Sequence, residues 1–281
     1  MSATRNPNLG SSHVRQKRHR LFFVRFGIVL FFLLMIIFGL AIFSGNERIT
    51  VKTFIVSGNA AVSSDEVLAI TNRDMTGRYF HLFTRNDFLI FPRFQIEDDL
   101  LIEIKTLKEV NIDWTAWGQI TIRVTERKPH SVWCTDLNNL QSECFLVDET
   151  GYLYSEAPVF SGNIFIKDYG HISTSTDPIG QHFLPSDIYA QIFNLVNVLA
   201  EQSIKVIAVS FDSSDFNFTL DNGLIIIFNN KNGLMAPFQN LLSALETKNL
   251  DLVRDAGSMN YLDLRYDNKI IIGKKQNVIK K

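Results

Sequence analysis

The sequence predicts an α+β protein that carries a single N-terminal transmembrane helix. Three observations predict this class. Residues 26–43 form an uninterrupted apolar stretch, residues 50–128 alternate between helix and strand patterns, and residues 129–273 are dominated by strand patterns. This order predicts a small α+β domain followed by a mainly antiparallel β domain with flanking helices.

The charge of the chain is distributed unevenly. Residues 1–43 hold six Lys and Arg and no acid, whereas the remaining residues hold 22 basic and 29 acidic side chains. Binding of nucleic acid without sequence preference needs Lys and Arg that neutralise phosphates, and an acidic body is poorly suited to it. We therefore expect no nucleic-acid partner.

The apolar stretch Phe26–Phe43 determines the predicted topology. It contains eighteen residues without a charge. As a helix it would be about 27 Å long, close to the thickness of the hydrocarbon core of a bilayer. The basic residues before it place the N-terminus in the cytoplasm by the positive-inside rule. Residues 1–25 are expected to be a disordered basic tail, because residues 1–20 hold few apolar side chains.

Two other interpretations of this stretch compete with a membrane anchor. A buried helix of a soluble protein would usually keep a polar stripe, which is missing here. A cleaved signal peptide would use Gly39-Leu40-Ala41 as its cleavage site, but the apolar run exceeds the usual length of about 7–15 residues and continues past that site. We therefore expect an uncleaved anchor at residues 26–43, with the rest of the chain outside the cytoplasm.

Residues 50–128 are predicted to form the small domain. Thr50–Val56 alternates like a half-buried strand. Ser63 and Glu66 form a capping box for a short helix, and a second helix is expected over Gln95–Leu107, with acids in its first turn. Two further strands complete the domain, at Val110–Trp114 and Gln119–Thr125.

Residues 129–273 are predicted to form the β domain. Asn222-Gly223 indicates a tight hairpin turn, because both residues tolerate positive φ. Ser186 is expected to cap one helix and Pro237 to begin another. The expected strands are Ser131–Cys134, Cys144–Val147, Tyr152–Tyr154, Asn163–Lys167, Lys205–Phe211, Phe216–Leu220, Leu224–Phe228, Tyr261–Tyr266 and Lys269–Ile272. Residues 274–281 are expected to be a basic tail.

The sequence shows no motif of a catalytic or cofactor site. It contains neither a phosphate-binding Gly loop nor a nucleophile elbow, and its six His residues are not spaced as metal ligands are. The acids of residues 212–221 hint at calcium, but Leu220 stands where an EF-hand loop needs Gly. Glu126 has no partner carboxylate at a definable spacing, so we expect an exposed strand residue rather than a catalytic acid. We expect no enzyme, no cofactor and no metal.

Cys134 and Cys144 flank a short loop on the two arms of a predicted hairpin. Because the compartment outside the membrane permits oxidation, a disulfide between them is the favoured interpretation. Two alternatives stay open. The residues could be separate thiols, or His130 could join the two thiolates around a metal, although a fourth ligand is not evident.

Several motifs occur in an order that resembles the FtsQ/DivIB family of bacterial cell-division proteins. The motifs are Phe54-x-Val56-x-Gly58 before a capped helix, Glu126-Arg127-x-Pro129 after the strand GQITIRVT, an exposed Trp133, Leu146-Val147-Asp148-x-x-Gly151, and Tyr261-Leu262-Asp263-Leu264-Arg265-Tyr266. The likeness covers roughly residues 20–273 and implies a basic tail, an anchor, a POTRA domain and a β domain. Trp117-Gly118 occupies a stretch where the family often has Pro.

The resemblance implies a non-enzymatic, bitopic scaffold of the divisome at the division septum. It implies partners of the FtsB/DivIC and FtsL class, which are small bitopic coiled-coil proteins, bound by strand addition at the C-terminal sheet edge. The residues that correspond to this edge are Arg265, Tyr266, Asn268, Lys269, Ile270, Ile271, Ile272 and Gly273. The segment 269–273 also reads as an edge strand by itself, because it is β-branched and close to the end of the sequence. Lys274 stands where some members have an aromatic residue.

Two rival functions remain open from the sequence. One is a POTRA-type transport or assembly factor of the cell envelope, for which we would expect a cleaved signal and a long series of barrel strands. The other is a membrane-tethered extracytoplasmic hydrolase, which would need a convergent nucleophile or metal set that the sequence does not show.

Overall fold

The computed structural model divides the chain into two compact units, Met1–Thr125 and Glu126–Lys281. The structure describes residues 11–274 except residues 45, 47–48, 137–141, 161, 163, 173–176, 213, 230–232, 248–249, 253, 255–256 and 267–268. Among the described residues the protein is α+β, with five α-helices and a large, mostly antiparallel sheet.

Helix α1 spans Ser11–Ser44 and begins well before the predicted Phe26. Within it, residues 20–44 are long and apolar enough to cross a membrane by length and composition. The expected disorder is therefore wrong for residues 11–25, while residues 1–10 lie outside the described part of the chain. The helix extends because Arg, Gln, Lys and Leu favour helices and no Pro lies between residues 8 and 44.

A small domain of two helices and a three-stranded sheet follows in the first unit. The sheet order is β1-β5-β4, and β1 runs parallel to β5. A two-stranded hairpin, β2–β3, lies between the helices in the sequence. The elements are β1 (Thr53–Ser57), α2 (Ser64–Asp74), β2 (Arg78–Tyr79), β3 (Phe83–Thr84), α3 (Arg93–Glu103), β4 (Leu107–Ala116) and β5 (Gln119–Glu126).

One apolar core holds this domain together. Ser63 caps α2, as predicted, and its side chain accepts a hydrogen bond from the amide of Asp65. Val67 of α2 and Leu100 of α3 pack with Ile120 of β5 in the core, all fully buried. Helix α3 ends at Glu103, so the prediction that it continues to Leu107 is wrong. Leu107 instead starts β4. The apolar spacing of residues 100–107 fits a helix, but it fits equally well a helix that ends earlier and a strand whose first buried residue is Leu107.

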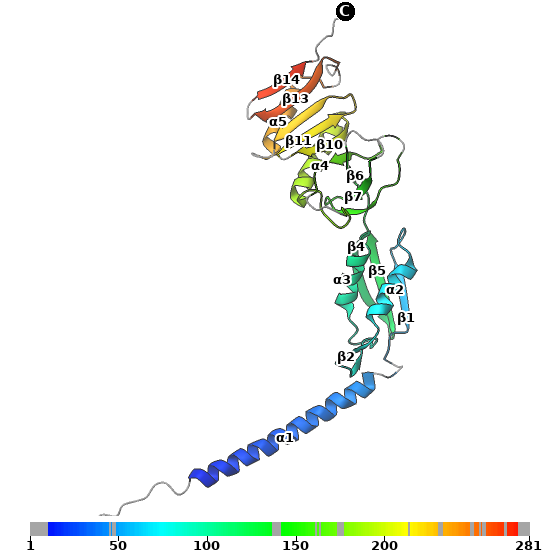
Figure 1. Cartoon of the computed structure of the whole chain (residues 1–281), viewed down its shortest axis with the longest axis vertical. Coiled ribbons are helices and arrows are strands. Elements are labelled where there is room, and N and C mark those ends of the chain that lie inside the picture. The colour runs from blue at the N-terminus through cyan, green and yellow to red at the C-terminus, as the bar shows by residue number, and fades with distance from the viewer. Residues whose placement is uncertain are drawn as a thin grey trace, which may run out of the picture. The chain divides into compact units, whose positions relative to one another are not determined.

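The second unit is built on one nine-stranded sheet. Its order is β14-β13-β12-β11-β10-β9-β6-β7-β8, and five of its eight pairings are antiparallel. Figure 1 shows β13 and β14 in red and orange at the C-terminal edge of the sheet. The elements are β6 (Ser131–Cys134), β7 (Cys144–Val147), β8 (Leu153–Glu156), β9 (Lys167–Tyr169), α4 (Ser186–Glu201), β10 (Val206–Asp212), β11 (Asp215–Leu220), β12 (Ile225–Asn229), α5 (Met235–Glu246), β13 (Met259–Tyr266) and β14 (Lys269–Lys274).

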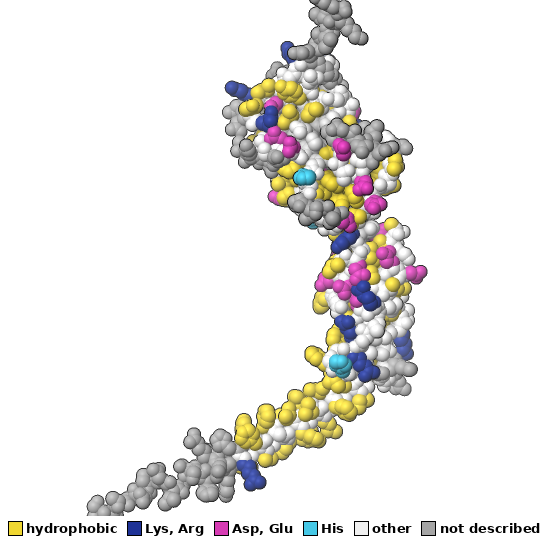
Figure 2. Space-filling view, in the orientation of Figure 1, with side chains coloured by type: hydrophobic (Ala, Val, Ile, Leu, Met, Phe, Trp, Pro, Cys, Tyr) yellow, Lys and Arg dark blue, Asp and Glu magenta, His cyan; other side chains and the backbone are white. Residues whose placement is uncertain are grey.

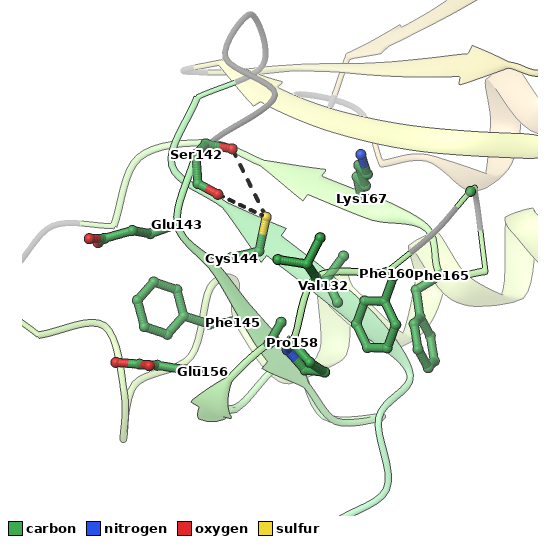
Figure 3. Close-up of a pocket in the computed structure, with 13 residues that line it drawn as sticks. Val132, Ser142, Glu143, Cys144, Phe145, Glu156, Pro158, Phe160, Phe165 and Lys167 are labelled. Atoms are coloured by element: carbon green, nitrogen blue, oxygen red, sulfur yellow. Dashed lines mark hydrogen bonds between the residues drawn. The ribbon is translucent and has the colours of Figure 1, made fainter.

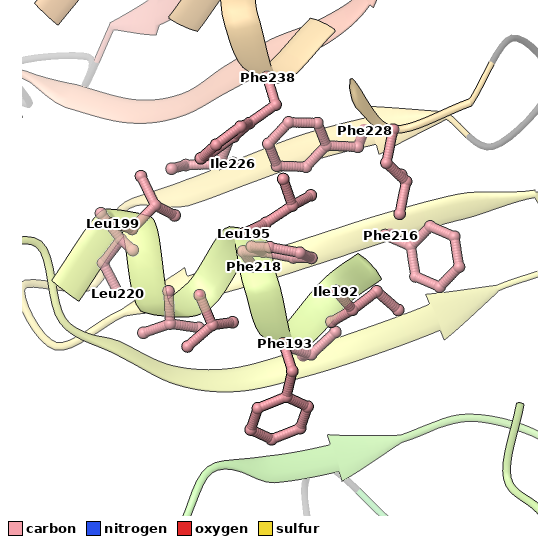
Figure 4. Close-up of a cluster of buried hydrophobic side chains, with 14 of the residues drawn as sticks. Ile192, Phe193, Leu195, Leu199, Phe216, Phe218, Leu220, Ile226, Phe228 and Phe238 are labelled. Atoms are coloured by element: carbon pink, nitrogen blue, oxygen red, sulfur yellow. The ribbon is translucent and has the colours of Figure 1, made fainter. Parts of the chain in front are cut away.

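Helices α4 and α5 cover one face of this sheet. Leu195 of α4 and Phe238 of α5 lie over Phe218 and Phe228 of the sheet (Figure 4), and all four are almost fully buried. Burial of such a side chain contributes about 1.5–3 kcal/mol. The alternating residues of β11 and β12 on the other face are only half-buried, so this sheet packs on helices through one side.

The structure confirms some local predictions and corrects others. The Asn222-Gly223 turn joins antiparallel β11 and β12, with Gly223 at φ 83°. Ser186 is not the helix cap, because α4 already begins there and Pro185 precedes it. Trp133 is not exposed. It is only 6% accessible, because it points to the helix-covered face and donates a hydrogen bond to the carbonyl of Gly170.

Replacing Gly58 with Ala should destabilise the small domain by more than replacing Gly77 with Ala. Both glycines have positive φ, 87° and 102°, where an Ala costs about 1–2 kcal/mol. A Cβ on Gly58 would also lie 2.2 Å from the carbonyl oxygen of Val124, whereas at Gly77 the nearest atom is a flexible Arg85 carbon at 3.8 Å. Urea unfolding followed by Trp114 and Trp117 fluorescence, in a Trp133→Phe background, measures both variants. Equal losses would contradict the close approach of β1 and β5.

Candidate functional site

The sheet edge at β14 is the place where the predicted partner-binding residues gather. Strand β14 pairs antiparallel with β13, with Asp263 opposite Ile271 and Tyr261 opposite Gly273. Within the described residues, β14 is the last strand of the sheet, and no strand pairs with its outer side. Such an edge presents unpaired backbone N–H and C=O groups.

Side chains along this edge are exposed although many are apolar. Tyr266 is 53% accessible, and Ile271 and Ile272 are each 41% accessible. The ring of Tyr261 lies directly over Gly273, where an added Cβ would come within 2.2 Å of it. The ring of Tyr261 therefore leaves no room for a side chain at residue 273. The predicted contact Asn268 lies outside the described residues.

Arg265 is engaged with its own chain. Its Nε and Nη2 donate to the two carboxylate oxygens of Asp263 at 2.9 and 2.6 Å, and its Nη1 donates to Asp215 at 2.8 Å. The bonds from Arg265 lower the pKa of Asp263. Burial alone would raise the pKa of Asp215, but bonds from Arg265 and Asn229 hold it below its ordinary value. Arg265 thus ties β13 to β11 across β12.

Arg127 of the Glu-Arg-x-Pro motif forms a second clamp, at the start of the second unit. Its guanidinium ion-pairs with the fully buried Asp148 and lies 4.0 Å from the centre of the Tyr152 ring. Asp148 also accepts bonds from Thr150 and from the amide of Tyr152. Burial would raise the pKa of Asp148, but the bonds from Thr150, Tyr152 and Arg127 lower it overall. The motif fixes the entering chain to the β7–β8 turn.

A third polar group is buried between the sheet and α4. Asp168 of β9 accepts hydrogen bonds from the hydroxyls of Ser131 and Tyr189, and it is only 2% accessible. Burial raises the pKa of Asp168 to about 7, although the two hydroxyl donors act in the opposite direction. This cluster lines no described pocket, and its geometry fits a structural link between β6, β9 and α4.

Cys134 and Cys144 form a disulfide between β6 and β7. The bond removes both thiolates, so the alternative metal site with His130 is wrong. Instead, the imidazole of His130 lies against the ring of Phe193, with ring centres 3.7 Å apart and ring planes tilted by 52°. Among the residues that the structure describes, no group of three or more His, Cys, Asp and Glu side chains is placed to hold a metal ion.

A pocket of about 350 Å³ lies beside this disulfide (Figure 3). Phe160 and Phe165 form one wall, with ring centres 5.0 Å apart, and Cys144 lies on the opposite wall. Glu143, Glu156 and Lys167 contribute the charges of the lining. The described lining contains no His and no thiolate, and its Ser142 bonds to the Cys144 sulfur, so it offers no evident nucleophile and base pair.

No protein-family model matches this chain, and no curated protein matches it either. The sequence pointed to the β14 edge and the disulfide, but it did not point to the partners of Arg265, Arg127 and Asp168. The predicted strand Asn163–Lys167 ended one residue before Asp168, whereas β9 spans Lys167–Tyr169, so the sequence pattern did not mark this carboxylate as a buried strand residue.

Replacing both Cys134 and Cys144 with Ala should lower the free energy of unfolding of the second unit by roughly 2–3 kcal/mol. The bond joins residues with a sequence separation of 10. Its removal raises the conformational entropy of the unfolded chain and so favours unfolding. Urea unfolding followed by Trp133 fluorescence, with Trp114 and Trp117 replaced by Phe, measures the change. Reductant should shift the parent protein and leave the double variant unchanged, and a parent protein indifferent to reductant would contradict the prediction.

Replacing Asp168 with Asn should abolish a loss of stability that the parent protein shows between about pH 4 and pH 7. The folded state keeps the proton up to about pH 7, while the unfolded chain releases it near pH 4. Stability therefore falls as pH rises through this window, by at most about 4 kcal/mol. Urea unfolding at pH 5 and pH 8 should show the variant gaining relative to the parent at pH 8. The exposed Asp187→Asn on α4 is the control, and equal slopes in all three proteins would contradict the assignment.

Proposed function

We propose that this chain is a non-enzymatic, membrane-anchored scaffold of bacterial cell division, of the FtsQ/DivIB type. In this proposal it holds partner proteins at the septum by adding a partner strand to β14. The observation that carries the proposal is the outer side of β14, which among the described residues has no strand beside it. The order of motifs along the sequence supports the family assignment.

Helix α1 supplies the membrane anchor in this proposal. The basic residues at its start favour a cytoplasmic N-terminus, which leaves both folded parts outside the cytoplasm. The disulfide between Cys134 and Cys144 supports this orientation, because such bonds persist in oxidising compartments.

The small domain of the first unit acts as a POTRA-like recruitment module in this proposal. Its order of β1, α2, α3, β4 and β5, with β1 parallel to β5, is the order expected of such a domain, and the β2–β3 hairpin is an addition between the helices. Loss of septal localisation after deletion of residues 50–128 would support this role, and unchanged localisation would count against it.

Strand addition at β14 has a simple physical basis. Alternate residues of an added strand would pair with the backbone groups that face outward from β14, and the β-branched Ile270, Ile271 and Ile272 favour the extended conformation. Tyr266 offers an exposed aromatic ring beside the edge. The partner class proposed is the FtsB/DivIC and FtsL group of small bitopic coiled-coil proteins.

Proline substitutions at Ile270 and Ile271 should separate binding from folding. Neighbouring residues of a strand direct their N–H groups to opposite sides, so one proline removes an outward N–H and the other breaks the β13–β14 pairing. The outward variant should keep the thermal midpoint of the parent and lose capture of an FtsB/DivIC-type partner in a pull-down. The inward variant should unfold at a lower temperature.

Two comparisons sharpen this experiment. Tyr266→Ala should weaken capture without changing the fold, whereas Trp117→Ala, which removes an exposed aromatic of the first unit, should leave capture unchanged. If the proline variant that keeps the thermal midpoint of the parent also binds the partner as the parent does, strand addition is wrong. A uniform rim of a fluorescently tagged chain in dividing cells, in place of a mid-cell band, would contradict the division role.

A further inference from the structure

A very short connection joins α1 to the small domain. Helix α1 ends at Ser44, and Ile49, the fifth residue after it, is already 4% accessible. A chain of this length reaches at most about 18 Å. Whatever the angle between helix and domain, the part of the domain that holds Ile49 stays within this distance of the helix end.

Backbone hydrogen bonds identify that part of the domain. The carbonyl of Ile49 accepts a bond from the amide of Phe88 at 2.8 Å. The amide of Lys52 donates to the carbonyl of Gly118 at 2.7 Å. The entering chain is therefore held between the loop before α3 and the turn between β4 and β5.

Large apolar side chains surround this entry point and face solvent. Trp114 and Trp117 are 59% and 66% accessible, and their rings lie 5.8 and 5.4 Å from the ring of Phe88. Leu89 and Ile90, next to Phe88, are 59% and 42% accessible. Single exposed apolar residues are common, but a contiguous group of this kind marks an interaction surface.

The β2–β3 hairpin adds a further exposed aromatic to this group. Phe80 at its tip is 88% accessible, and Leu82 is 44% accessible. Phe80 and His81 have positive φ values of 49° and 63°, a conformation that bulky residues rarely adopt. The hairpin thus keeps an aromatic ring in solvent at a conformational cost, which is typical of functional segments.

Basic side chains lie among these apolar ones. Lys52, Arg78 and His81 are exposed, while the acid Asp87 is buried and accepts a hydrogen bond from the amide of Leu89. Figure 2 shows basic, His and hydrophobic side chains gathered at the end of the small domain that carries β2 and β3. A surface of this composition attracts anionic headgroups.

We infer that this surface rests in the headgroup region of the bilayer that α1 crosses. Trp side chains favour that region, and Lys and Arg bind its anionic lipids. The connection of at most about 18 Å leaves little room for a protein between the surface and the membrane. The inference depends on the proposed membrane anchor and is independent of strand addition at β14. The surface consists of Phe80, Leu82, Leu89, Ile90, Trp114 and Trp117, with Lys52 and Arg78.

Tryptophan fluorescence of the full chain in lipid nanodiscs tests this inference. The chain has 3 Trp residues, so Trp133→Phe leaves only Trp114 and Trp117 as reporters. Nanodiscs of phosphatidylcholine and phosphatidylglycerol are prepared with and without phosphatidylcholine brominated near the headgroup. The expected result is loss of emission in the brominated discs and little quenching by aqueous iodide.

Two matched variants identify the side chains responsible. A Phe80→Ser and Leu89→Ser double variant should reduce quenching by brominated lipid and increase quenching by iodide. Ile102→Ser changes an equally exposed apolar residue, 61% accessible, near the far end of α3, and should behave as the parent does. Circular dichroism shows that each variant is folded.

The outcomes distinguish this inference from the proposed anchor. A chain that does not co-elute with the nanodiscs contradicts the anchor and, with it, the lipid-binding surface. A chain that co-elutes but whose Trp emission is quenched by iodide and not by brominated lipid contradicts the surface alone. Equal behaviour of the double variant and Ile102→Ser also overturns the inference.

Discussion

Packing of α4 and α5 on a single face of the nine-stranded sheet is the interaction on which the second unit depends. The helices bury alternate residues of β11 and β12, such as Phe216, Phe218 and Phe228, and they bury Leu262 and Leu264 of β13 in the same core. Because β13 is held by this core, β14 can be the next strand without helix cover of its own. The edge strand is thus supported by its neighbour and stays accessible.

The periodicity of the sequence predicted most strands of this sheet, but it could not predict their order. Period-two patterns and the Asn222-Gly223 turn locate β10, β11 and β12, because these features are local. The parallel pairings of β9 with β6 and β10, and of β12 with β13, join segments far apart in the chain. The predicted ends of two helices were also wrong. At Leu107 one apolar pattern fits both a helix and a strand. Before Phe26 the helix continues through charged residues, which an apolar pattern does not mark.

For the polar sites, too, local features could be predicted from the sequence, whereas contacts between distant residues could not. The strand β14 was predictable because its consecutive β-branched residues, Ile270, Ile271 and Ile272, are a local signature of extended structure. The pairs that fix the second unit are separated by 21 residues for Arg127 and Asp148, 37 for Ser131 and Asp168, and 50 for Asp215 and Arg265. A charged or hydroxyl side chain carries no sign of such a distant partner. The resemblance pointed to Arg127 and Arg265, and the structure supplies the physical reason for each.

The bidentate bond between Arg265 and Asp263, extended to Asp215, has a consequence for the thermodynamics of association. It links β13 to β11 across β12, so the strand against which β14 pairs is already ordered before another polypeptide arrives. An ordered receptor loses little conformational freedom when a ligand arrives, and most of the entropic cost then falls on the incoming segment. Variation in affinity among ligands of this edge would then reflect how readily each ligand becomes extended.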